Sequence, residues 1–288
     1  MERELWNALC RIAERLYNRS SRACYGDDVI CGVLWWAVVH DRPVRWACDA
    51  GNWPSALVRR ALPSQPTMSR RLRTAEIALL LDEVERTLAA LYVVAGPRVL
   101  AVDGKALPVG GPSKDHDATW GPASRSFAKG YKLHVVWGTE PLPVAWALAP
   151  LNVSERRIAA KLLAELPGEG YVLGDKFFDA NDLYEAAASS GYQLLAAQQQ
   201  PGRALGHRRH SPHRLRGLEL LKTTFGRRLY RQRCRVEHQF AKLNNFVGGL
   251  GPLPFWVRRF HRVKLWVHCK LLINAAHQLI LEKQIAGW

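Results

Sequence analysis

The sequence predicts an α/β protein in which a mixed β-sheet follows an all-helical region. The first 96 residues carry apolar side chains at helical spacing. After Gly96 and Pro97 the pattern changes to short apolar runs, in the order three strands, helix, strand, helix, strand. This order is typical of one five-stranded mixed sheet with flanking helices. With 288 residues, 48% of them hydrophobic, the chain can bury a sizeable core.

The helical region starts with an apolar helix face over residues 29–38. A short helix is predicted after Pro43, and the Gly-Asn-Trp-Pro segment at 51–54 ends it. Ser64 can then cap another helix, which has Pro66 in its first turn. The region therefore contains a short helix, a turn and a further helix.

The helix that follows Pro66 is basic on the side expected to face outward, because Met68 and Leu72 are expected to face inward. A short helix, a turn and a basic helix would suit a helix-turn-helix that reads the major groove. The alternative is a solvated basic helix in an ordinary bundle, since such patterns are degenerate. The DNA-binding residues predicted here are Arg70, Arg71 and Arg73.

Two of the five predicted strands end on an acidic residue. The first strand runs from Arg98 to Asp103, and the fourth ends at Asp175. Strands are also expected over 132–137, 144–148 and 192–196. Asp179 is expected to cap the helix that begins near residue 181. Residues 198–228 are rich in Arg, His and Gln, and we expect a basic insertion without regular structure there, because Pro212 would interrupt a helix.

Positive charge is concentrated at the carboxyl end of the chain. Residues 203–288 hold 18 Lys and Arg but three acids, so they carry nearly all of the net charge of +16. Such a balance predicts a polyanionic partner, with nucleic acid ahead of a membrane surface. The uncharged run over 29–40 has 12 residues and is too short to span a bilayer. The six cysteines form no C-x-x-C pair, which favours reduced, buried thiols.

One carboxylate, Glu237, lies within this basic region on a predicted helix with an apolar stripe at 229, 236, 240, 243 and 247. Beside the stripe, Tyr230, Arg233, Glu237 and Asn244 would share one face of a continuous helix. A final helix is expected from about 255 to 280. In this part of the chain, the cations predicted to hold DNA phosphates are Arg233, Lys242, Arg258 and Arg259.

Three carboxylates at Asp103, Asp175 and Glu237 suit phosphodiester chemistry. Two Mg²⁺ ions (or Mn²⁺) can activate water and stabilise the leaving oxygen, and both ions prefer carboxylate ligands. We expect Asp103 to bridge the two ions, with one ion held by each of the other two acids. Each acid alone could also be a cap, a turn residue or a surface ion-pair partner.

The segments Ala-Val-Asp-Gly-Lys at 101–105, Gly-Tyr-Lys-Leu-His at 130–134 and Leu-Gly-Asp-Lys-Phe-Phe-Asp at 173–179 resemble bacterial insertion-sequence transposases of the DDE type. The pattern Tyr230-x-x-Arg233-x-x-x-Glu237 resembles the signature helix of that family, which has a lysine where this chain has Asn244. The resemblance implies an RNase H-like fold and a catalytic, metal-binding triad of Asp103, Asp175 and Glu237. It also implies DNA contacts by Tyr230 and Arg233, and we add Lys176.

The same resemblance implies the organisation and partners of the chain. Residues 1–96 would bind transposon ends, and residues 97–288 would form the catalytic domain. Water would attack at an element end to free a 3′-OH, which would then attack target DNA. The expected partners are double-stranded DNA (terminal inverted repeats and target) and a second copy of the chain, in the bacterial cytoplasm at the nucleoid. Two alternatives remain: a catalytically silent, transposase-derived DNA-binding protein, and a stand-alone RNase H-like nuclease.

Overall fold

The computed structural model describes residues 1–17, 24–57, 61–92, 96–123, 126–202, 205 and 209–282. Contacts within the chain divide it into two compact units. One unit joins residues 1–93 to residues 242–288, and the other spans residues 94–241.

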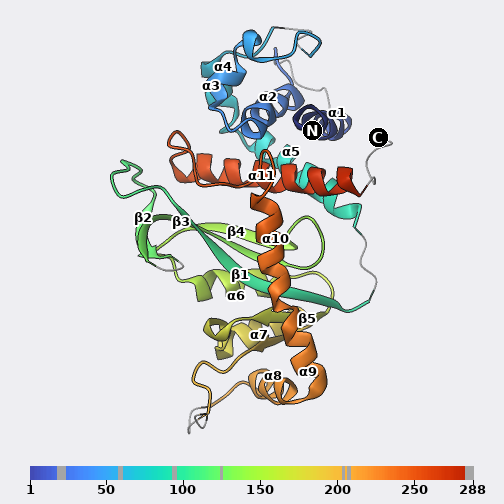
Figure 1. Ribbon diagram of the computed structural model, residues 1–288, viewed down its shortest axis with the longest axis vertical. Coiled ribbons are helices and arrows are strands. Elements are labelled where there is room, and N and C mark those ends of the chain that lie inside the picture. Colours follow the sequence, from blue (N-terminus) through green and yellow to red (C-terminus); the bar gives the residue numbers. More distant parts are fainter. Residues whose placement is uncertain are drawn as a thin grey trace. The chain divides into compact units, whose positions relative to one another are not determined.

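The first unit is helical (Figure 1). Its helices are α1 (Glu2–Leu16), α2 (Asp27–Val39), α3 (Val44–Ala47), α4 (Gln65–Arg71), α5 (Ala75–Ala90) and α11 (Phe260–Leu281), with a 3-10 turn at Ala50–Asn52. Helices α1, α2, α5 and α11 pack against one another. The predicted cap is present, because the Ser64 hydroxyl accepts a hydrogen bond from the Thr67 amide and Pro66 lies in the first turn of α4.

Helix α11 is buried on nearly all sides over its central turns, from Val263 to Leu279. Within it, Lys270 is fully buried, and its ammonium donates to the carbonyls of Val38 (2.9 Å) and Gly248 (2.8 Å) and to Asp41 (2.6 Å). All three of its protons therefore have acceptors, as a buried ammonium requires.

The boundary of the units differs from the prediction, which assigned all of residues 97–288 to one domain. Residues 242–288 belong to the helical unit instead. The physical reason lies in α11, whose apolar residues surround the helix and must be covered by several neighbours. Helices α1, α2 and α5 supply that cover.

The second unit is built on a six-stranded mixed sheet. Its strands are β1 (Arg98–Pro108), β2 (Thr119–Pro122), β3 (Phe127–Trp137), β4 (Ala145–Pro150), β5 (Gly170–Gly174) and β6 (Tyr192–Ala196). The order is β2-β3-β1-β5-β6, with β4 also paired to β3. β3 is antiparallel to β1, β2 and β4, whereas β5 is parallel to β1 and β6. This is the predicted α/β, RNase H-like arrangement, with β2 as an additional strand of four residues, two of them Gly and Pro, that gave no strand pattern in the sequence.

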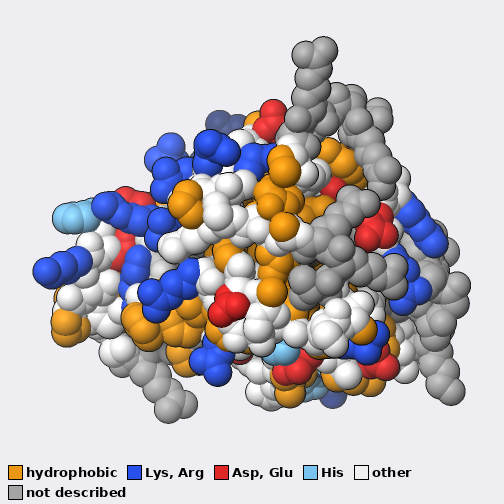
Figure 2. Space-filling model, turned by 90° about the horizontal axis from the view of Figure 1, so that it is seen from above, with side chains coloured by type: hydrophobic (Ala, Val, Ile, Leu, Met, Phe, Trp, Pro, Cys, Tyr) orange, Lys and Arg blue, Asp and Glu red, His pale blue; other side chains and the backbone are white. Residues whose placement is uncertain are grey.

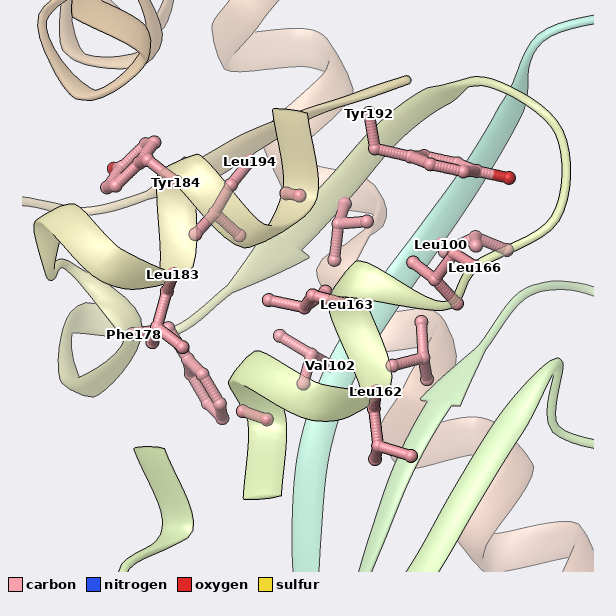
Figure 3. Packing of buried hydrophobic residues seen from close by; sticks show 14 of the residues in the cluster. Leu100, Val102, Leu162, Leu163, Leu166, Phe178, Leu183, Tyr184, Tyr192 and Leu194 are labelled. Atoms are coloured by element: carbon pink, nitrogen blue, oxygen red, sulfur yellow. The ribbon is translucent and has the colours of Figure 1, made fainter. Parts of the chain in front are cut away.

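Helices α6 (Glu155–Ala164) and α7 (Asn181–Ser189) cover one face of this sheet. Figure 3 shows their leucines packed between the helices and the strands. Leu100 and Val102 of β1 and Leu194 of β6 meet Leu163 and Leu183 there. Because side chains alternate along a strand, the intervening residues of β1 point to the opposite face.

The predicted basic insertion is largely helical, which corrects the expectation of an irregular segment. Residues 212–230 form α8 (Pro212–Lys222) and α9 (Thr224–Tyr230). Pro212 does not interrupt α8; it occupies the first turn, where no amide donor is needed, and the Ser211 hydroxyl caps the helix. Residues 203–204 and 206–208 of the predicted insertion, including His207, lie outside the described residues.

No helix in the part of the chain that the structure describes has the length and apolar character needed to cross a membrane.

Candidate active site

Asp103 and Asp175 lie side by side on two neighbouring strands. β1 and β5 run parallel, and Ala101 pairs with Leu173. Each acid follows its paired residue by two positions, so the two carboxylates lie at the same level and on the same face of the sheet. The prediction that a strand ends at Asp103 is wrong, because β1 continues to Pro108 in its pairing with β3, whereas β5 does end just before Asp175.

The face that carries Asp103 lies opposite the α6–α7 core and is covered by helix α10 (Cys234–Asn244). The Phe240 ring packs edge-on against Trp137, whose strand position pairs with Ala101, with ring centroids 5.8 Å apart. Gln239 is buried and its amide nitrogen donates to the carbonyl of Thr139 at 3.0 Å. These contacts hold α10 over the strand that bears Asp103.

Asp175 begins a 3-10 turn at Lys176–Phe178, and its carboxylate accepts the Phe177 amide at 2.8 Å. Tyr230, the last residue of α9, donates its hydroxyl to the carbonyl of Gly174 at 2.9 Å. That hydrogen bond places the start of the predicted signature segment next to Asp175. Lys176 itself is exposed.

The environment of Asp103 disfavours its charged form. Burial raises the pKa of Asp103, and the negative charges of Asp175 and Glu155 raise it further. The Gly104 amide, which donates to Asp103 at 2.7 Å, and the cation of Arg233 act in the opposite direction on this pKa. A buried carboxylate that faces a second negative charge forms a site that a bound cation would stabilise.

Glu237 is linked to this site through Arg233. The Arg233 guanidinium donates to the Glu237 carboxylate at 3.2 Å, and the Glu237 side chain is 58% exposed. The predicted continuous helix through residues 230–244 is wrong, because a 3-10 turn at Arg231–Arg233 separates α9 from α10. The turn lets Tyr230 reach the end of β5 while α10 follows the opposite face of β1.

The three predicted acids do not form a compact cluster. Among the described residues, a His, Cys, Asp or Glu group with ligand atoms all within 4.8 Å is found at Asp82, Glu85 and His268, not at Asp103, Asp175 and Glu237. A two-metal site does not require such closeness. With ions about 3.5–4 Å apart and bonds of about 2 Å, ligands of different ions can lie about 8 Å apart.

Asp179, which the sequence suggested as a helix cap, has a different role. Ala180 occupies the cap position of α7, and no side chain caps that helix. The Asp179 side chain is completely buried and accepts two hydrogen bonds from the Arg214 guanidinium, at 2.7 and 2.8 Å. It also accepts the Gln199 amide at 3.0 Å. Asp179 therefore ties α8 to the segment after β5 and is fully occupied by these partners.

A second ion pair near the site was missed in the sequence. Lys132 on β3 donates to Glu155, the first residue of α6, at 3.0 Å. A Cβ at Gly104 would lie 2.5 Å from a Glu155 oxygen and 2.9 Å from Lys132 Cδ, so a side chain there would push this ion pair aside. The Gly-Tyr-Lys segment at 130–132 was part of the recognised pattern, but its acidic partner lies 23 residues away.

The predicted DNA-binding cations differ in how far their side chains are exposed or held by hydrogen bonds. Arg70, Arg73 and Arg259 are exposed. Arg71 instead donates to Asp27 at 2.5 Å and to the Tyr25 carbonyl at 2.9 Å, so its guanidinium is held within the helical unit. Lys242 and Arg258 also form hydrogen bonds within the protein. Lys242 donates to Gln278 at 3.1 Å, and Arg258 donates to the carbonyl of Pro254 at 2.7 Å. Lys and Arg side chains outnumber acidic ones on the face in Figure 2.

Comparison with protein families gives a match to the transposase DDE domain over residues 95–272. The matched segment covers more than half of the chain and includes Asp103, Asp175 and Glu237. The chain belongs to the DDE transposase family. Comparison with curated proteins and with solved structures gave no match. For this transposase, the family match includes the whole six-stranded sheet and also most of α11, which packs in the helical unit.

Proposed function

We propose that this transposase cleaves DNA at the ends of an insertion sequence and joins the freed 3′-OH to target DNA, using Asp103, Asp175 and Glu237. The observation that carries the proposal is the register of β1 and β5, which brings the carboxylates of Asp103 and Asp175 together beneath a helix that bears a third.

The donor set fits hard divalent cations. Asp103 and Asp175 offer carboxylate oxygens from two adjacent strands, and their mutual repulsion falls when a cation lies between them. A pair of Mg²⁺ or Mn²⁺ ions bound there would activate the attacking oxygen and stabilise the leaving one. Asp103, Asp175 and Glu237 are the residues that would hold these ions.

Glu237 is the residue that must change partner. Its carboxylate is exposed and bonded to Arg233, whose charge also acts on Asp103. An exposed pair of this kind is worth roughly 0–1 kcal/mol, so a small gain is enough to redirect it. When Glu237 turns toward the acids on the sheet, Arg233 becomes available for a DNA phosphate beside the scissile bond.

The chain's cations supply the DNA contacts in this proposal. Arg70 and Arg73 extend from α4 and would lie against the duplex of a terminal inverted repeat. Lys176, exposed directly after Asp175, would hold the strand that is cut. Arg258 and Arg259, at the start of α11, would add phosphate contacts. A homodimer is the expected working form, because two element ends must be joined in one event, at the bacterial nucleoid in the cytoplasm.

The test is cleavage and strand transfer on labelled duplexes that carry the terminal repeats flanking the gene, with Mg²⁺. Glu237→Gln should bind these duplexes like wild type but lose at least about a hundredfold in cutting and joining, since a metal ligand is removed. Glu219→Gln is the matched control, because Glu219 is an exposed helical acid with its own lysine partner, Lys222. This control should cut at the wild-type rate.

Other outcomes would support the alternatives. If wild type and Glu237→Gln cut equally, Glu237 is an ordinary surface residue of α10 and the triad is wrong. If both proteins bind but neither cuts, the chain is a DNA-binding protein without catalysis. Cutting of any duplex or junction without joining would identify a stand-alone nuclease.

A further inference from the structure

A histidine and two carboxylates meet between two helices of the helical unit. Asp82 and Glu85 lie one turn apart on α5, and His268 lies on α11, which packs against α5. One imidazole nitrogen of His268 lies 2.6 Å from Glu85, and the other lies 4.0 Å from Asp82. One ligand atom from each residue lies within 4.8 Å of the other two. No residue of this group belongs to the proposed catalytic triad.

Burial distinguishes this group from an ordinary surface cluster of charges. The His268 side chain is 7% exposed and that of Glu85 is 21% exposed, so packing of α5 against α11 fixes both orientations. Asp82 is 59% exposed and leaves one side of the group open to solvent. The group therefore combines two fixed donors with an exposed third donor, and an entering ion can reach it and keep a water ligand.

The donor types indicate which cation fits. Because imidazole binds a metal in its neutral form, this donor set would carry the negative charge of two carboxylates, which a divalent ion would neutralise. Imidazole nitrogen favours Zn²⁺ and similar transition metals, whereas Mg²⁺ prefers oxygen alone. In a tetrahedral zinc site with bonds of about 2.0–2.2 Å, ligand atoms lie about 3.4 Å apart. Reaching that spacing requires the Glu85–His268 contact to open by about 1 Å and Asp82 to close in by a similar amount.

We propose that Asp82, Glu85 and His268 bind a Zn²⁺-class ion that fastens α11 to α5. The ion would replace the direct Glu85–His268 contact with two metal–ligand bonds and add a third to Asp82. It would thus join the two chain segments of the helical unit, one near the start of the chain and the other near its end. The site is distinct in residues and in metal preference from the proposed Mg²⁺ site.

The test measures Zn²⁺ bound to the full-length chain by equilibrium dialysis and elemental analysis. Asp103→Asn and Asp175→Asn are included in every protein, so that the catalytic carboxylates do not contribute. This background should retain one Zn²⁺ per chain at micromolar free zinc. Adding Asp82→Asn should weaken zinc binding at least tenfold, while Glu83→Gln should leave it unchanged. Glu83 is the neighbouring exposed acid on α5 and pairs with Arg86.

Thermal unfolding provides the second measurement. Zn²⁺ should raise the Tm of the background protein and of Glu83→Gln, but not that of Asp82→Asn, because the ion stabilises only the folded state that binds it. His268→Gln should also lose the zinc-dependent rise, whatever its own Tm. Equal zinc binding and equal Tm shifts in Asp82→Asn and Glu83→Gln would overturn the proposal and assign any bound zinc to other residues, such as the cysteines. DNA cleavage with Mg²⁺ by the otherwise wild-type chain tests the proposed function separately.

Discussion

At the residue scale, Asp103 occupies a position that suits catalysis better than stability. Its carboxylate is largely withdrawn from water and faces the charges of Asp175 and Glu155. The folded protein therefore holds the proton of Asp103 to a higher pH than the unfolded chain does. Stability linked to that proton is present at low pH and is lost as the pH rises through the folded-state pKa. At neutral pH without a cation, the ionised Asp103 destabilises the α/β unit.

Asp103→Asn is accordingly expected to raise the Tm in EDTA at neutral pH, although it should abolish cleavage. Asparagine removes the charge and keeps an oxygen that can accept the Gly104 amide. The gain is expected to be about 2–4 °C for each kcal/mol recovered. Calorimetry at neutral and at acidic pH measures it: the difference between the variant and wild type should shrink as the pH falls, since Asp103 then becomes neutral.

Mg²⁺ provides the control for this expectation. It should raise the Tm of wild type more than that of Asp103→Asn, because the cation relieves repulsion that the variant lacks. A lower Tm for Asp103→Asn in EDTA at neutral pH would contradict the expectation that the charge of Asp103 destabilises the folded protein when no cation is bound.

At the element scale, the sequence predicted the parts of the site that depend on strands and missed those that depend on helix packing. Asp103 and Asp175 could be paired in advance because each follows a buried apolar run, which is a local strand pattern, and parallel strands bring matching positions together, although β1 continues past Asp103 to Pro108. The break between α9 and α10 has no comparable signal. The apolar spacing continues through Arg231–Arg233, and the turn is specified by the distant hydrogen bond from Tyr230 to Gly174.

Helix α8 shows the same limitation. Its sequence is basic, and Gly217 is its one buried residue, so no buried apolar stripe predicts a helix there. The helix is held by the Asp179–Arg214 pair and by the close approach of Gly217 to β6. A Cβ at Gly217 would lie 2.7 Å from the Leu194 carbonyl oxygen and 2.9 Å from the Tyr184 ring. Both anchors involve residues at least 23 positions away in sequence (217 − 194 = 23), and neither is visible as a local pattern.

Gly217→Ala is therefore expected to destabilise the protein, by about 1–3 kcal/mol from overpacking. In an exposed helix the same substitution would stabilise by about 1 kcal/mol, so the sign of the effect is diagnostic. Urea unfolding measures the change. Arg216→Ala, at the neighbouring position of α8, serves as the control and should change stability by less than about 0.5 kcal/mol. Greater stability of Gly217→Ala would show that α8 does not lie against β6.

At the scale of the whole molecule, the two compact units group the chain differently from the predicted domains. A boundary near residue 96 was predicted because the apolar period changes there, and one unit does change to the other at residues 93–94. The return of residues 242–288 to the helical unit has no such signal, because a helix that is apolar all round does not indicate its partners. Its buried Lys270 finds acceptors at Val38 and Asp41, more than 200 positions earlier in the chain.

The net charge of +16 is the other property of the whole molecule, and it predicts steep salt dependence of DNA binding. Neutralising 6–10 phosphates would lower affinity by about 10³–10⁵ between 50 and 200 mM salt. Replacing both Arg70 and Arg73 with Ala should reduce the slope of log K against log salt by about 1.8, since each exposed arginine is expected to displace one counterion. Fluorescence anisotropy on a terminal-repeat duplex over a salt series measures the slope.

Arg71→Ala separates DNA contact from structure in this experiment. Its guanidinium is held by Asp27 and the Tyr25 carbonyl, so its loss should lower the Tm of the helical unit and leave the salt slope of the folded protein nearly unchanged. A slope that falls for Arg71→Ala and stays constant for the Arg70, Arg73 double variant would place the DNA on a different side of α4. An unchanged slope in both variants would remove α4 from the DNA interface and leave the arginines that follow residue 209 as its main cations.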